Sequence, residues 1–191
     1  EKDANDNLTG KRVTTSDYAS ASYYYVNKSS LPKVYGGFNT SLSWKGFDLS
    51  AIFAYSIGGY IYNRHITMIL HNGSLEGRAW STEILRRWTP DNRYTDVPAL
   101  STTSNNWNSA STRFLQNNSY MRLKNLTLSY NLPKPWVSKL ALSSVQVYVQ
   151  GDNLFTIHRN QGLDPEQGIT GITYYRYPAM RTISGGINLS F

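Results

Sequence analysis

The final stretch of the sequence alternates strictly between apolar and polar residues, and this pattern restricts its fold more than any other feature. From residue 182 to residue 191 it reads TISGGINLSF. Ile183, Ile187, Leu189 and Phe191 share one parity with Gly185, and the other parity holds only small or uncharged polar residues. Such alternation predicts a β-strand with one apolar and one polar face. Two environments suit this strand: the wall of a bacterial outer-membrane barrel, with lipid on the apolar side, or the edge of a soluble sandwich.

Four further segments alternate in the same way and are also predicted to be strands. The first two lie within 35–60 and are joined by Lys45-Gly46, a two-residue turn in which glycine supplies the required positive φ. Segments 119–132 and 145–155 are the other two. Trp44 and Phe47 flank the tight turn on the apolar parity. Aromatic residues at this position are typical of the girdle that a membrane barrel places at the lipid headgroups, although a sandwich core would also accept them.

The connections between the predicted strands are alternately short and long. The turn at 45–46 and the segment 133–142 are short, whereas 57–119 and 156–179 are long and rich in polar residues and glycine. Short periplasmic turns and long extracellular loops alternate in this way in outer-membrane barrels. This assignment places the C-terminus on the side of the short turns.

Regular structure is less evident elsewhere in the sequence. The spacing of apolar residues between 75 and 88 predicts a short amphipathic helix there. Residues 1–34 are predicted to be an extracellular loop with one possible preceding strand, at 18–26. Residues 136–142 are predicted to form a short turn or a helical cap.

Composition excludes some classes of protein. The 191 residues include no cysteine, so neither a disulfide framework nor a thiolate metal site is possible. The net charge is +7, but the basic residues are scattered and no nucleic-acid motif is present, so we predict no nucleic-acid partner. No apolar run approaches the roughly 18 residues of a membrane helix. Neither a cytosolic nor an envelope location is excluded by the composition.

Six blocks of the sequence keep a distinctive order and spacing. They read YGGFNTSLSWKGFDLSAIFAYSIGGYIYN, RRWTPDNRYTDVPAL, SYMRLKNLTLSYNLP, VYVQGDNLFTI, GLDPE and RTISGGINLSF. Together they resemble the C-terminal part of SusC-type (SusC/RagA family) TonB-dependent transporters, the outer-membrane nutrient importers of Bacteroidetes. The resemblance covers nearly the whole chain from Leu31 onward. Each block alone is weak evidence, and the six together are specific.

The resemblance implies an all-β fold: a segment of an antiparallel transmembrane β-barrel, contributing five or six of 22 strands, with long extracellular loops. Residues 35–191 would supply these strands, with the long loops at 57–119 and 156–179. It further implies an N-terminal plug, a segment that contacts the TonB complex, and a SusD-like lipoprotein that acts as a lid. Neither the plug nor the TonB-contacting segment is present in this sequence. Because five or six strands cannot close a barrel in outer-membrane lipid, we expect the remaining strands and the plug to come from another part of the same transporter.

Neither a catalytic constellation nor a metal site is predicted, and no cofactor is expected. His65, His71 and His158 lack metal-ligand spacing, and we predict that they are solvated or lumenal. Asp164 and Glu166 flank a proline in the GLDPE block. Paired carboxylates can hydrolyse glycosidic bonds, but here we interpret them as part of a structural loop motif.

Binding is predicted instead, through aromatic residues and arginines of the long loops. Aromatic rings can stack on sugars or contact peptide side chains, and arginines can bind a carboxylate-bearing ligand or the lid. The candidate contacts are Trp80, Arg86, Arg87, Tyr94, Trp107, Tyr174 and Tyr175. The alternative is that the aromatic residues among them pack the loops against each other.

A second set of residues is assigned to the membrane. The predicted lipid-facing residues are Leu126, Leu128, Tyr130, Ile187 and Leu189. Phe191 stands at the position of the terminal aromatic residue that, in the family it resembles, is the signal read by the barrel-assembly machinery.

The leading hypothesis is therefore the C-terminal barrel portion of a TonB-dependent importer in the bacterial outer membrane, taking up oligosaccharides or oligopeptides without bond chemistry. A soluble carbohydrate-binding β-sandwich is the alternative from the class of binding modules. A glycan hydrolase of β architecture is the alternative from the class of enzymes.

Overall fold

The computed structural model describes residues 15, 17–21, 23, 25–73, 75–101, 103, 106–166, 168–173 and 176–191. The chain divides into two compact units. The loop unit comprises residues 1–27 and 64–114, and the sheet unit comprises residues 28–63 and 115–191. Residues 1–14, 16, 22 and 24 of the predicted opening loop lie outside the described residues.

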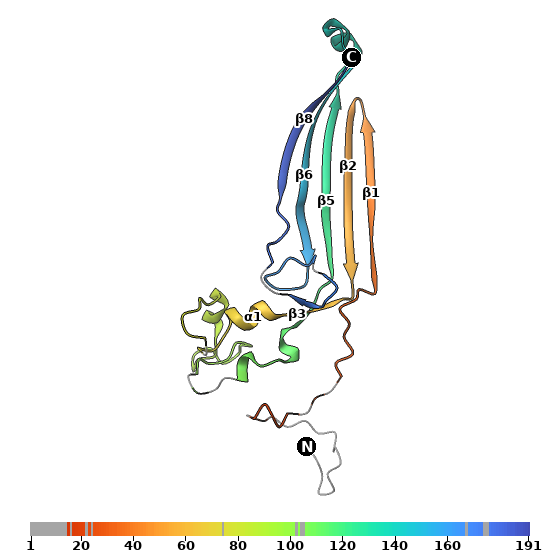
Figure 1. Cartoon of the computed structure of the whole chain (residues 1–191). Helices are drawn as coiled ribbons and strands as arrows, with labels where there is room; N and C mark the ends of the chain where they lie inside the picture. The colour runs from red at the N-terminus through yellow and green to blue at the C-terminus, as the bar shows by residue number, and fades with distance from the viewer. Residues whose placement is uncertain are drawn as a thin grey trace. The chain divides into compact units, whose positions relative to one another are not determined.

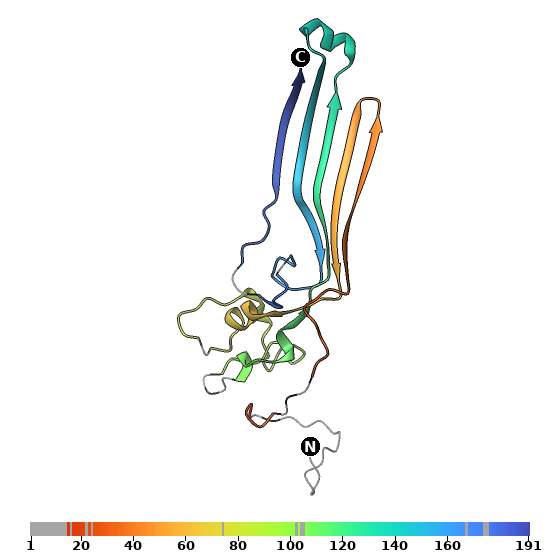
Figure 2. The same ribbon diagram turned by 45° about the vertical axis from the view of Figure 1, so that its right-hand side comes forward.

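The sheet unit is built on five antiparallel strands that lie side by side in one curved layer (Figures 1 and 2). Their order in the sheet is β1-β2-β5-β6-β8. The strands are β1 (Val34–Trp44), β2 (Phe47–Ile57), β5 (Tyr120–Asn131), β6 (Ser144–His158) and β8 (Thr182–Ser190). All five predicted strands are confirmed, and β6 continues three residues beyond its predicted end.

The strand register aligns the apolar residues of all five strands on one face. Leu49 of β2 pairs with Leu42 of β1 and with Leu128 of β5, which in turn pairs with Val149 of β6. One step along each strand, the polar parity aligns equally well, with Ser50, Thr127 and Gln150 among the neighbours. Because successive side chains of a strand point to opposite sides, the sheet has one apolar face and one polar face.

A β-bulge keeps β5 in phase with its neighbours. Along the sequence the apolar residues change parity between Leu123 and Leu126. In the structure the register shifts at Lys124, so Leu123 pairs with Phe53 and Phe155 while Leu126 stays on the same face. An extra residue in one strand re-aims the side chains beyond it. The bulge therefore directs both halves of β5 with their apolar residues to one side, and it leaves Arg122 on the polar face.

The short connections and the chain end lie at one end of the sheet. The β1–β2 turn consists of Lys45 and Gly46, both with positive φ, as a two-residue hairpin turn requires. The β5–β6 connection contains α2 (Lys134–Val137) and η4 (Ser138–Leu140), which confirms the predicted helical cap. Phe191 follows β8 at this same end (Figure 1).

A small second sheet stands at the opposite ends of the long strands. It has the order β4-β3-β7, from β4 (Leu115–Asn117), β3 (Tyr60–Asn63) and β7 (Ile172–Thr173). Asn63 and Thr173, a pair across the parallel β3–β7 ladder, are fully buried. This sheet was not predicted, because its strands are too short to display alternation.

Most of the apolar face of the large sheet is exposed, and no second layer of the sheet unit lies over the long strands (Figures 1 and 2). Leu42 is 66% exposed, Leu128 42%, Val149 48% and Ile187 64%. Aromatic residues gather at the end with the short connections, where the Phe47 and Tyr130 rings lie 4.4 Å apart and Lys45 Nζ lies 4.9 Å from the Trp44 ring centre. Exposed apolar surface this continuous is unusual for a soluble monomer and indicates a surface that meets lipid or protein.

The loop unit is held together by short helical turns and side-chain contacts. It contains α1 (Arg64–Ile69) and three 3₁₀ turns: η1 (Thr82–Arg86), η2 (Asn106–Asn108) and η3 (Thr112–Phe114). Phe114, Val97 and Ile84 are buried in it. None of the helices in the described residues is both long enough and apolar enough to cross a membrane.

Two sequence predictions for the loop unit are wrong. The amphipathic helix predicted at 75–88 is only the single turn η1, because Ile84 alone of its apolar residues is buried, while Leu85 is 74% exposed. The strand proposed at 18–26 is absent from the described residues of that segment. Tyr18 instead begins a turn, and its hydroxyl donates a hydrogen bond to the Ala110 carbonyl.

Candidate functional site

Hydrogen-bonded side chains cover the polar face of the large sheet. Asn125 donates to Asp152 across the β5–β6 pair at 2.8 Å, and Thr127 donates to Asn125 at 2.9 Å. Nearer the short turns, Asn131 donates to Asp48 across β5 and β2 at 2.7 Å. The polar face therefore carries its own network of side-chain hydrogen bonds, unlike the apolar face behind it.

A cluster of four charged residues lies on this face near the long connections. Arg122 is 3% exposed, and its guanidinium donates to Asp164 at 2.5 Å, to Glu166 at 2.8 Å and to the Thr156 hydroxyl at 2.9 Å. Lys124 at the bulge donates to both oxygens of Glu166 at 2.6 Å. Two positive and two negative charges are thus paired within the cluster. The GLDPE block is fixed to β5 by these contacts, which gives it the structural role interpreted from the sequence.

Backbone groups complete the coordination of Asp164. Its carboxylate also accepts hydrogen bonds from the Ala179 N–H at 2.7 Å and the Glu166 N–H at 2.9 Å. Burial by itself would raise the pKa of Asp164, but the two backbone N–H groups and the Arg122 guanidinium outweigh burial and lower this pKa below its ordinary value. Asp164 therefore ties both ends of the 159–181 connection to the sheet in its ionised form.

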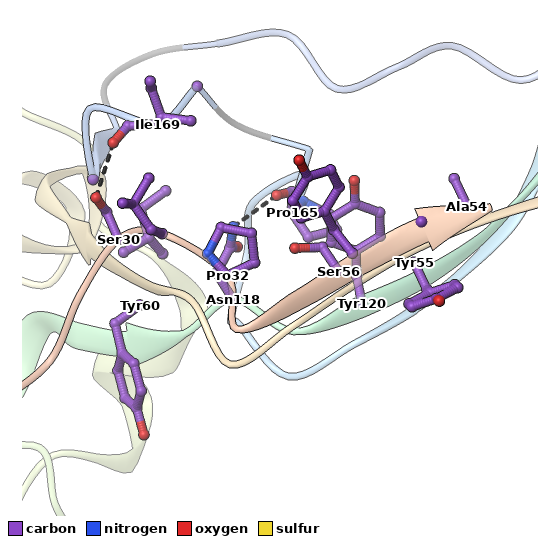
Figure 3. A pocket seen from close by; sticks show the side chains of 16 residues that line it. Ser30, Pro32, Ala54, Tyr55, Ser56, Tyr60, Asn118, Tyr120, Pro165 and Ile169 are labelled. Atoms are coloured by element: carbon purple, nitrogen blue, oxygen red, sulfur yellow. Dashed lines mark hydrogen bonds between the residues drawn. The ribbon is translucent and has the colours of Figure 1, made fainter.

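A cavity of about 450 Å³ lies beside the GLDPE turn in the sheet unit (Figure 3). Residues from β1, β2, β3, β5, the segments before β1 and β5, and the 159–181 connection line it, and none of these lining residues is charged. Asn118 donates to the Pro165 carbonyl at 2.8 Å and Ser30 donates to the Ile169 carbonyl at 2.9 Å, the two bonds drawn in Figure 3. The hydroxyl, amide and apolar groups around it suit an uncharged group such as a sugar ring or a peptide side chain.

The structure places five of the seven predicted contact residues in the loop unit. Trp80 is 45% exposed, and its indole N–H donates to His71 Nδ1 at 3.1 Å. The backbone N–H groups of Gly73 and Leu75 point to the same nitrogen, at 3.3 and 3.4 Å. His71 is 2% exposed, so the prediction that it is solvated or lumenal is wrong. The three N–H groups converge on Nδ1, so the imidazole anchors the loop that carries Trp80.

Trp107 has a packing role in the loop unit. Its indole N–H donates to the Leu70 carbonyl, and the guanidinium of Arg113 lies 3.4 Å from its ring centre. Arg113 also donates to the Asp96 carbonyl. Trp107 therefore fits the alternative in which a loop aromatic residue packs one loop segment against another.

The remaining candidate contact residues differ in their exposure and in the hydrogen bonds and ion pairs they already make within the protein. Arg86 pairs with Glu83 at 2.5 Å and with Asp96 at 3.5 Å, and the Arg87 carbonyl accepts a hydrogen bond from Asn92. Tyr94 is fully exposed at 101%. Tyr94 and the exposed part of Trp80 are thus the predicted contacts best placed to meet another molecule. Tyr174 and Tyr175 lie outside the described residues.

Sequence reasoning missed the pairing of Arg122 with Asp164 and Glu166. These residues lie more than 40 positions apart, and no local pattern connects them. The only signal was the change of apolar parity in β5, which marks the bulge beside Arg122. Within the described part of the chain, no group of three or more histidine and acidic side chains is arranged to hold a metal ion.

The chain is similar to known TonB-dependent receptors. It is 35% identical over 166 residues to TonB-dependent receptor P3 of Formosa agariphila, and the match covers 81% of this chain and 16% of that protein. It is 27% identical over 171 residues to TonB-dependent receptor SusC of Bacteroides thetaiotaomicron, covering 87% of this chain and 16% of SusC. The chain thus spans about a sixth of the length of these relatives. No protein-family model matches it.

Solved structures agree with these relatives. The RagAB peptide importer in its closed-closed state matches all of this chain with a TM-score of 0.81 and 35% identity, over 20% of the RagAB chain. The open-open state matches 94% of this chain with a TM-score of 0.80 and 36% identity, over 19% of the RagAB chain.

The fold class is confirmed: the chain is an antiparallel β-sheet segment, and its structural neighbours are TonB-dependent transporter barrels. Within that class, the resemblance to SusC-type transporters of the SusC/RagA family is confirmed as well. These relatives are receptors and transporters, not enzymes.

Replacing Arg122 by Met should strongly destabilise the protein, because the buried Asp164 carboxylate would lose its charged partner. We expect the free energy of unfolding, measured with urea in detergent, to fall by about 3–5 kcal/mol. Lys124→Met is the matched control, since Lys124 is one-third exposed and bonds the outer carboxylate Glu166. Its cost should be at most about 1 kcal/mol. Equal costs for the two variants would contradict the assignment of Arg122 as the buried centre of the cluster.

Acid should release the 159–181 connection from the sheet. Because the folded-state pKa of Asp164 is lowered, its contribution to stability is fully present above its unfolded pKa of about 3.9 and is lost as the pH falls through the folded value. Pulsed hydrogen–deuterium exchange, corrected for intrinsic rates, should show constant protection of this segment from about pH 7 to about pH 5 and increasing exchange below about pH 3.9. Asp164→Asn should flatten this profile, and an unchanged profile in that variant would refute the role of Asp164.

Proposed function

We propose that this chain forms part of the wall of an outer-membrane importer that takes up oligopeptides or oligosaccharides, works with a SusD-like lipoprotein lid and is driven by the TonB complex. The chain contributes no bond chemistry. The lid and the long loops capture the ligand, and the polar face of the sheet lines its path. The rest of the barrel, the plug and the TonB-contacting segment belong to other parts of the same transporter.

The observation that carries this proposal is the alignment of one continuous apolar face across five hydrogen-bonded strands. Hydrocarbon requires apolar side chains on its side of a barrel and leaves the lumenal side free to be polar. Leu126, Leu128, Tyr130, Ile187 and Leu189 are assigned to the lipid side, and all five have the parity of that face. A soluble sandwich would need a second layer over this face, and the described sheet unit contains none, which favours the importer over the carbohydrate-binding module.

The two edges of the sheet support the same proposal. β1 and β8 are the outer strands, and each pairs with only one neighbour in the described structure. An unpaired backbone group in hydrocarbon costs several kcal/mol. We assign both edges to further strands of the barrel, and Phe191, 92% exposed after β8, to the assembly signal.

Cargo and lid contacts are proposed from the relatives and the exposed loop residues. RagAB is a peptide importer, which supports short peptides as cargo, and oligosaccharides are the other proposed cargo. Tyr94 and Trp80, with Arg86 and Arg87 beside them in sequence, are proposed to contact the ligand or the lid. Trp107 stays a candidate, and its indole N–H already donates a hydrogen bond within the loop unit.

One pair of variants tests both the membrane facing and the transport role. Leu128→Arg places a charge on the apolar face between Leu49 and Val149, and it should cost about 2–4 kcal/mol of stability in lipid if the position lies near the bilayer midplane. Thr127→Arg places the same charge on the polar face, so it should fold normally and alter uptake. Folding is measured by heat-dependent gel mobility of the full protein, and transport by uptake of a labelled peptide and a labelled oligosaccharide.

The two readouts separate the parts of the proposal. Equal tolerance of arginine at positions 127 and 128 would refute the membrane facing. A folded protein that imports neither cargo, with its lid and TonB present, would refute the transport role while leaving the fold intact.

A further inference from the structure

A second cavity lies on the other side of the GLDPE turn in the sheet unit, and its volume is about 530 Å³. It is bounded by the end of β6, by residues 162–165 and by the segment 176–181 that leads into β8. Pro165 lines both this cavity and the uncharged cavity described above. The turn that Arg122 holds against the sheet therefore separates two cavities of different chemistry.

The charges in the lining of this second cavity do not balance. Its charged groups are Asp164 and three arginines: Arg122, Arg176 and Arg181. Asp164 is already paired with Arg122, and Arg122 also binds Glu166. Arg176 and Arg181 are exposed, and among the described residues neither guanidinium has a hydrogen bond or an ion pair. Two positive charges therefore remain uncompensated at this cavity.

The guanidinium of Arg176 lies against the loop that carries it, beside Gly168, which lines the uncharged cavity. Its Nη1 and Nη2 atoms lie 3.8 and 3.9 Å from the point where a β-carbon on Gly168 would stand, so the guanidinium lies over the backbone of its own loop. The neighbouring His158 has Nδ1 3.0 Å from the Asn160 carbonyl, which accounts for that nitrogen within the protein. Arg176 and Arg181 are thus the charged groups at this cavity whose guanidinium groups have no partner among the described residues.

We infer that Arg176 and Arg181 form a subsite for the carboxylate of a peptide, such as its C-terminal group. A guanidinium offers several donors in one plane, and it suits a carboxylate better than a neutral group. The volume of about 530 Å³ is within the range of small-molecule sites and is sufficient for the end of a peptide. The uncharged cavity across the GLDPE turn has the chemistry for a neighbouring uncharged part of a ligand. This inference rests on the peptide cargo proposed above and adds to it a preference for a free carboxylate.

The test compares two peptides that differ only in that group. The probe is a short fluorescein-labelled peptide of Ala, Ser and Gln, made with either a C-terminal carboxylate or a C-terminal amide. Binding to the full transporter in detergent is followed by fluorescence anisotropy at physiological ionic strength. We expect the carboxylate form to bind about tenfold more tightly than the amide. The double variant Arg176→Gln/Arg181→Gln should remove this preference and leave the affinity for the amide unchanged.

Arg159→Gln is the matched control. Arg159 is an exposed arginine in the same connection, but it does not line the cavity. Its loss should leave the preference intact, whereas an equal loss of preference in this control would show general charge attraction and overturn the inference. Equal affinity of the unaltered protein for both peptides would also overturn it.

The remaining outcomes separate this inference from the proposed function. If both peptides bind and are imported without a preference, the carboxylate subsite is wrong and the importer stands. If neither peptide binds, the peptide cargo and the subsite both fail. Binding of an oligouronate instead, with dependence on the two arginines, would assign the site to acidic glycans and reject the peptide assignment.

Discussion

Side-chain parity across hydrogen-bonded strands is the constraint on which the rest of this structure depends. Each strand of the large sheet directs alternate residues to opposite sides, and the register between neighbours decides whether those sides agree. A slip of one residue in any pair would move leucines onto the polar face and serines onto the apolar one. The two-residue turn at Lys45-Gly46, with positive φ at both residues, fixes the register of β1 with β2. The bulge at Lys124 keeps the apolar residues of both halves of β5 on the same face. The result is a single layer with two chemically different surfaces, which suits the boundary between hydrocarbon and a hydrated path.

The same bulge connects the sheet to the long connection that follows β6. By re-aiming β5, it leaves Arg122 on the polar side, where the guanidinium meets Asp164 and Glu166. Burying these charges is expensive unless each is paired and hydrogen-bonded, and here the partners are present. The GLDPE turn is consequently fixed against the wall, and the two cavities on either side of it differ in charge. Irregular connections can in this way acquire defined surfaces without forming secondary structure of their own.

Local pattern was sufficient to predict the five long strands, because alternation, glycine in the tight turn and prolines after β5 are all readable in short windows. It could not predict the Arg122 cluster, since residues more than 40 positions apart must be brought together by the register first. The helix expected at 75–88 failed for a related reason. Its apolar spacing is satisfied by contacts such as Trp80 with His71, and not by one buried helical face. Likewise the three-stranded sheet pairs segments as short as two residues, which carry no periodicity.

The central claim, that hydrocarbon contacts the apolar face, is tested most directly by nitroxide labels on neighbouring strands. Labels would replace Leu49, Leu128 and Val149 on one face and Ser50, Thr127 and Gln150 on the other, each in the full protein in lipid bilayers. Collision rates with oxygen, which concentrates in hydrocarbon, are compared with those of a water-soluble nickel complex. If hydrocarbon contacts the apolar face, the ratio of oxygen to nickel accessibility will be higher at all three apolar positions than at their polar neighbours. Equal ratios on the two faces, or a higher ratio on the polar face, would contradict it.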